Sequence, residues 1–158
     1  MRSKTTLIFG TGNDILTDDG IGIRITEDLE RLLHGRDISF RTAGCGGLEI
    51  IEYIKDYELV IFIDGIRTGG GIPGEVYHFR PKDFRETTHL SNLHDISFLT
   101  ALKLARSINL SLPEEIHIIA IEIIEDMTFS EEFTPLIREK YPMILDKVFG
   151  IVTAITGR

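Results

Sequence analysis

Short runs of β-branched and apolar residues recur along this chain, and each is separated from the next by a segment with turn or helical spacing. We predict strands at residues 5–9, 38–42, 59–63, 76–79 and 116–123. Parallel neighbours in a sheet need long crossovers, usually helices, so this alternation favours an α/β fold. We expect a three-layer, open, twisted and mostly parallel sheet with helices on both faces, and we allow for one antiparallel strand at 76–79.

The predicted helices begin at recognisable start signals. They open near residue 20, after the glycine turn at 44–47, at Asn92 and at Pro135. Asn92 is expected to cap its helix and to place His94 in the first turn. Pro142 is expected to end a short helix and to begin a longer one. No repeat, low-complexity tract or linker interrupts residues 1–158, which we therefore expect to form a single domain.

Composition excludes several classes of protein. A net charge of −8 argues against generic nucleic-acid binding, which needs clustered Lys and Arg. The apolar run at 116–124 is far shorter than the roughly 20 residues that span a bilayer, so we expect no membrane segment. The N-terminal apolar stretch is too short for a signal peptide. A single cysteine, Cys45, cannot form an internal disulfide, and we expect a reducing, cytoplasmic location.

Ligand-type side chains follow the predicted strands. Asp18 and Asp19 come after the first strand, Asp64 follows the third, and His94 lies at a helix entry. Ligands of open α/β sheets collect at the carboxyl ends of the strands, so we expect Asp19, Asp64 and His94 to become neighbours. Two carboxylates and one imidazole suit nickel, zinc, iron or manganese and leave coordination positions open. Alternatively, Asp19 caps a helix, Asp64 is a turn residue and His94 is structural.

Two further interpretations stay open. The turn Gly10-Thr11-Gly12-Asn13 resembles a dinucleotide-binding turn, but the third glycine is missing and Asp14 would face a pyrophosphate. Cys45 lies between glycines before a predicted helix, where a thiolate is favoured, and His94 would then be its base. A lone cysteine is more often a small core residue.

Residues 10–29, GTGNDILTDDGIGIRITEDL, resemble the opening signature of the hydrogenase maturation endopeptidases. The similarity continues through GCGGLEII at 44–51, FIDGI at 62–66 and the helix at 91–105 that contains His94. It covers nearly the whole chain. The resemblance implies a phosphorylase/hydrolase-like α/β fold and an endopeptidase activity.

The resemblance also implies a ligand set and a substrate. The nickel-binding carboxylates of the family fall on Asp19 and Asp64, and its histidine ligand falls on His94. The implied substrate is a nickel-iron hydrogenase large-subunit precursor, already loaded with nickel and cleaved after its last metal-binding motif. The nickel is presented by that substrate, and zinc or cadmium is expected to substitute in isolation. Asp18 is a candidate base or a support for the ligands. We expect a monomer with no nucleic-acid or membrane partner.

The sequence departs from the family pattern at three places. Asp19 stands where the family has Asp or Glu, and Cys45 stands where threonine is frequent. Residues 122–129 read EIIEDMTF, where many relatives carry a Pro-Glu pair and then a glycine, which points to a difference in substrate choice. The alternative functions are a non-enzymatic nucleotide- or metal-binding module and a related peptidase with a substrate other than hydrogenase.

Overall fold

The computed structural model describes residues 5–34, 36–44, 48–85 and 93–157, and at residues 48, 84–85 and 93–99 it describes the backbone alone. Its strands are β1 (Thr6–Thr11), β2 (Ile38–Ala43), β3 (Leu59–Ile66), β4 (Val76–Phe79) and β5 (Glu115–Glu122). Its α-helices are α1 (Ile21–Leu32), α2 (Leu48–Ile54), α3 (Leu93–Ser107) and α4 (Pro135–Thr156). Two short 3₁₀ helices, η1 (Thr17–Gly20) and η2 (Pro81–Arg85), complete the described elements.

The strands form one sheet in the order β2-β1-β3-β5-β4. The pairs β1–β2, β1–β3 and β3–β5 are parallel, and the edge strand β4 runs antiparallel to β5. The predicted α/β class, with one antiparallel strand at 76–79, is confirmed. The central strands read as almost continuous apolar runs because both of their faces are covered.

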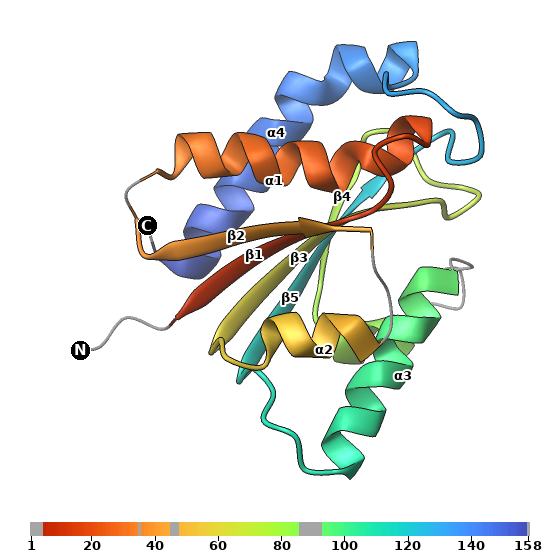
Figure 1. The fold of residues 1–158 in the computed structure, drawn as a ribbon. Coiled ribbons are helices and arrows are strands. Elements are labelled where there is room, and N and C mark those ends of the chain that lie inside the picture. The colour runs from red at the N-terminus through yellow and green to blue at the C-terminus, as the bar shows by residue number, and fades with distance from the viewer. Residues whose placement is uncertain (1–4, 35, 45–47, 86–92, 158) are drawn as a thin grey trace.

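The helices cover both faces of the sheet. Figure 1 shows α1 and α4 on one side and α2 and α3 on the other. The core under α1 and α4 includes Ile8, Ile61 and Ile63 of the sheet, and the core under α2 and α3 includes Phe9 and Phe62. Successive side chains of a strand point to opposite faces, so each strand contributes to both cores.

Two predicted boundaries are wrong. The strand expected to stop at residue 63 continues to Ile66, because Asp64 and the residues after it keep their pairing with β5. Pro142 does not divide the last helix, which is continuous over Pro135–Thr156. Ile137 and Ile144, on either side of the proline, are both fully buried in the same core. Packing of one apolar face therefore holds the helix together across a residue that lacks an amide donor.

A helix approaches the sheet closely at Gly22, in the first turn of α1. A side-chain carbon added there would lie 2.3 Å from the carbonyl oxygen of Ile63 and 2.5 Å from that of Thr11. The same carbon at Gly10 would lie 2.5 Å from the carbonyl oxygen of Gly22. Two glycines thus let the start of α1 rest directly on the carboxyl ends of β1 and β3.

Among the described residues, no helix combines the length and apolar character that crossing a bilayer requires.

Candidate functional site

The strand order reverses at β1, and open α/β sheets leave a crevice at the carboxyl ends of the strands at such a point. From β1 the chain passes through α1 to β2 on one side, and it then returns through α2 to β3 on the other side. The chain leaves β1 through η1 toward α1 on one face of the sheet, and it leaves β2 toward α2 on the other face (Figure 1). Such a switch point is where open α/β sheets bind ligands. The 3₁₀ helix η1 follows β1, and some of its Cα atoms lie within 8 Å of Cα atoms of β3.

Asp19 lies in η1 at this crevice and is half-buried. Its Oδ2 accepts a hydrogen bond of 2.9 Å from the backbone N–H of Asn13. Gly12 has a φ of +139°, and a side-chain carbon there would lie 2.1 Å from the carbonyl oxygen of Asp19. The glycine turn is therefore folded tightly over Asp19 and holds its carboxylate at the mouth of the crevice.

Asp18, the neighbour of Asp19, is completely buried. Its carboxylate accepts hydrogen bonds from the backbone N–H groups of Ile124, Glu125 and Thr134, at 3.2, 3.1 and 2.8 Å. The Thr134 hydroxyl lies 3.1 Å and 3.0 Å from its two oxygens. The hydrogen bonds of this carboxylate tie η1 to the segment between β5 and α4. Of the two roles considered for Asp18, they favour that of a support over that of a base.

Asp18→Ala is expected to destabilise the protein by about 3–5 kcal/mol, because three part-buried backbone N–H groups lose the fully buried carboxylate that accepts from them. Urea unfolding followed by circular dichroism measures the change. Asp37→Ala, at an exposed position, is the matched control and is expected to stay within about 0.5 kcal/mol of the parent. Equal stability of the Asp18 and Asp37 variants would contradict the assigned support role.

Asp64 lies near the carboxyl end of β3 and is half-buried. Val60 and Phe62, which share its parity along the strand, belong to the core under α2 and α3, so Asp64 points to that same face. Its Oδ1 accepts a 2.8 Å hydrogen bond from the N–H of Gly65. Asp19 therefore follows β1 and Asp64 lies near the end of β3, the strand paired with β1. That the two carboxylates lie close enough to share an ion stays a prediction.

His94 is the second residue of α3, in the first helical turn as predicted. Its side chain lies outside the described part of the structure, as do Asn92 and Cys45. The helix packs on the face of the sheet to which Asp64 points, since Ala101, Leu102 and α2 share the same core. The three predicted ligands thus lie on η1, β3 and α3, and their convergence in one crevice stays a prediction. Among the side chains that the structure describes, no group of three His, Cys, Asp or Glu is close enough to hold a metal ion.

A second carboxylate on this face was missed from the sequence. Glu122, at the end of β5, is 3% exposed and lies two residues after Ala120, which is in register with Asp64, so its side chain is on the same face. Its Oε1 accepts hydrogen bonds from the Thr68 backbone N–H at 3.2 Å and hydroxyl at 2.6 Å, while its Oε2 is buried and has no hydrogen-bond partner among the described residues. Burial and the nearby acidic groups raise the pKa of Tyr77 to about 12. The available signal was an acidic residue at the end of a mostly apolar strand.

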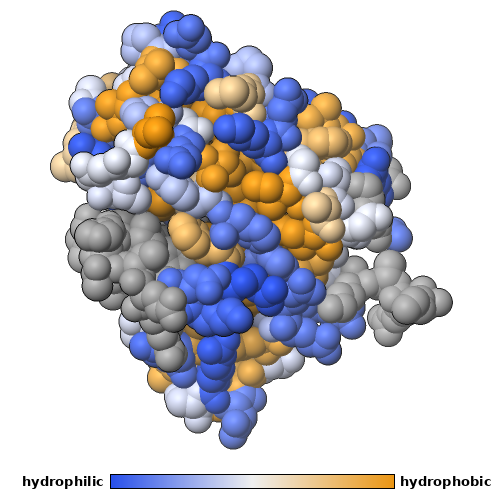
Figure 2. Space-filling view, turned by 180° about the vertical axis from the view of Figure 1, so that it is seen from behind, coloured by the Kyte–Doolittle hydropathy of each residue, from blue (hydrophilic) through white to orange (hydrophobic). Residues whose placement is uncertain are grey.

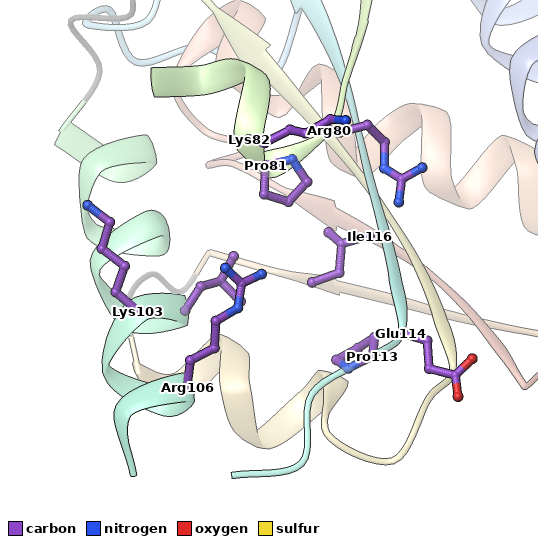
Figure 3. A pocket seen from close by; sticks show the side chains of 9 residues that line it. Arg80, Pro81, Lys82, Lys103, Arg106, Pro113, Glu114 and Ile116 are labelled. Carbon is purple, nitrogen blue, oxygen red and sulfur yellow. The ribbon is translucent and has the colours of Figure 1, made fainter. Parts of the chain in front are cut away.

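A cavity of about 380 Å³ lies elsewhere, between α3, η2 and the start of β5. Figure 3 shows Arg106 reaching from α3 toward it, while Lys103 points away. Ile116 lines it, four residues before Ala120. At roughly 3.3 Å per residue this is about 13 Å along the strand from the level of Asp64. The cavity is therefore distinct from the crevice, and its cationic side chains do not converge.

The chain matches the family model described as HycI, hydrogenase maturation protease, over residues 23–151. It is 31% identical over 78 residues to the hydrogenase 2 maturation protease of Escherichia coli strain K12. That alignment covers 49% of this chain and 48% of the relative, so it spans about half the length of either protein.

Solved structures share the fold over almost the whole chain. The hydrogenase maturating endopeptidase HybD from Escherichia coli has a TM-score of 0.76 at 24% identity, covering 98% of this chain and 93% of that one. The [NiFe] hydrogenase maturation protease HybD from Thermococcus kodakarensis has a TM-score of 0.71 at 21% identity, covering 99% of both chains. The family match covers most of the chain and includes Asp64 and His94. The chain belongs to the hydrogenase maturation protease family.

Proposed function

We propose that this protein is an endopeptidase that removes the C-terminal extension of a nickel-iron hydrogenase large-subunit precursor after nickel insertion. Asp19, Asp64 and His94 bind the nickel that the precursor presents, and this places the scissile peptide beside the metal. The observation that carries the proposal is the position of Asp19 and Asp64 on either side of the switch point, with α3 bordering the same face. We also propose that the reaction takes place in the cytoplasm and that the enzyme is a monomer.

The donor set suits the proposed cargo. Carboxylate oxygens and a neutral imidazole are ligands of borderline divalent ions such as nickel and zinc, and three protein ligands leave positions for groups of the substrate. Two roles for the bound nickel are consistent with this arrangement. Either the ion polarises the peptide carbonyl and lowers the pKa of an attacking water, or it serves as the recognition feature while a carboxylate acts as base.

The alternative of a nucleotide site at the glycine turn is disfavoured by the contacts of that turn. The N–H of Asn13, in the turn that a pyrophosphate would approach, already donates to the Asp19 carboxylate. A carboxylate in this position repels phosphate instead of attracting it. No contact among the described residues favours the non-enzymatic module over the peptidase.

The direct test is to incubate the purified protein with its cognate precursor and to weigh the products by mass spectrometry. The nickel-loaded precursor is expected to lose one C-terminal peptide, and the same precursor prepared without nickel is expected to stay intact. Equal cleavage of both forms would reject recognition through nickel. An intact nickel-loaded precursor would reject the proposed activity.

A further inference from the structure

Met127 and Phe129 are the most exposed large hydrophobic side chains of the described structure, at 78% and 79%. Both lie in the loop between β5 and α4, residues 123–134, which we call the β5–α4 loop. In Figure 2, hydrophobic residues also reach the surface among hydrophilic ones over the upper part of the molecule. A single exposed apolar side chain needs no explanation, but two within three residues indicate a contact surface.

Several hydrogen bonds hold the part of this loop that carries the two side chains. Glu125 Oε1 accepts from the backbone N–H groups of Met127 and Thr128, at 2.7 and 3.1 Å. The carbonyl of Thr128 accepts a 2.5 Å hydrogen bond from the Thr17 hydroxyl. These backbone bonds lower the pKa of the Glu125 carboxyl, because they favour its charged form. Met127 and Phe129 are therefore presented on an ordered backbone, so that little backbone entropy remains to be lost on binding.

The loop is fastened to the turn that carries Asp19. Asp18 binds the N–H groups at the start of the loop, and Leu16 and Ser130 form an isolated parallel bridge. The N–H of Ser130 also donates to the carbonyl of Ile15, whose own side chain is 45% exposed. Figure 1 shows the two loops side by side at the carboxyl end of the sheet. A polypeptide held at Asp19 therefore passes close to the loop that carries Met127 and Phe129.

We propose that Met127 and Phe129 form a docking surface for an apolar segment of the large-subunit precursor and so determine which precursor is accepted. This inference rests on the proposed function. The surface contributes the same binding free energy in the ground state as in the transition state, because it lies beside the crevice and supplies no reacting group. Removing it therefore raises KM and leaves kcat unchanged.

The test compares the double variant Met127→Ser/Phe129→Ser with the parent, using initial rates over a range of nickel-loaded precursor concentrations. Burying one large apolar side chain contributes roughly tenfold to affinity, so the double variant is expected to raise KM by about tenfold if one side chain is buried by the substrate and by about 100-fold if both are. Ile108→Ser is the matched control. Ile108 is 59% exposed and follows α3, at the opposite end of that helix from His94. Its KM is expected to equal that of the parent.

The outcomes separate the two proposals. If the parent protein leaves the precursor intact, the proposed function fails and the docking surface falls with it. If the parent cleaves the precursor and the double variant keeps its KM, or if Ile108→Ser raises KM equally, the docking surface alone is overturned. Thermal unfolding confirms that each variant is folded, and Phe129→Ala replaces the double variant if that one is unstable.

Discussion

Asp64→Asn is expected to abolish cleavage of the nickel-loaded precursor, by at least about 1,000-fold in kcat/KM, or roughly 4 kcal/mol. The substitution keeps the size of the side chain and the Oδ1 acceptor for the Gly65 N–H, but it removes the charge that binds a divalent ion. The fold is therefore expected to stay intact. Initial rates by mass spectrometry and far-UV circular dichroism measure the two effects separately.

His94→Ala is expected to behave in the same way, because it removes the imidazole ligand. Asp146→Asn is the control for the change of charge, since Asp146 is exposed on α4, on the opposite face of the sheet from Asp64. This control is expected to cleave the precursor at the parent rate. Full activity of either Asp64→Asn or His94→Ala would reject the assignment of that residue as a ligand.

Gly22→Val is expected to lower the free energy of unfolding by about 4 kcal/mol or more, or to prevent folding. Its new side chain would meet the carbonyl oxygens of Ile63 and Thr11, and both belong to the backbone of central strands that cannot move aside. Because native domains are stable by only about 5–15 kcal/mol, this single change removes a large part of the total. Urea unfolding measures it.

Gly150→Ala is the matched control for the glycine substitution. Gly150 lies inside α4, and a side-chain carbon there would have no neighbour within 4 Å. Alanine is favoured over glycine in a helix, so this variant is expected to gain about 0.5–1 kcal/mol. A Gly22→Val protein as stable as the Gly150→Ala protein would show that α1 does not rest on the sheet at this glycine.

The layers and the location of the crevice could be predicted because they follow from local patterns. Buried apolar runs and helical periodicity determined the order of the elements, and this order placed Asp19 and Asp64 at strand ends. Pro142 was misread because a local rule for proline ignores the apolar face that continues from Ile137 to Ile144. Burial of that face is a tertiary effect, which local signals do not contain.

The contacts of Asp18 and Glu122 could not be predicted because they join residues that are distant in sequence. Asp18 binds residues more than 100 positions away, and Glu122 binds Thr68, 54 positions away. Nothing near Asp18 in the sequence distinguishes it from Asp19, although one is wholly buried and the other lies half-buried at the crevice. Whether His94 completes the ligand set stays a prediction.

Anomalous diffraction from crystals of this protein grown with cadmium tests the convergence of the three side chains most directly. Cadmium stands in for the nickel of the substrate, and the expected result is one anomalous peak at the carboxyl end of β1 and β3. The peak should lie about 2.0–2.6 Å from a carboxylate oxygen of Asp19, one of Asp64 and an imidazole nitrogen of His94. A peak bound by other side chains, or a His94 imidazole too far away to share an ion with Asp19 and Asp64, would contradict the account.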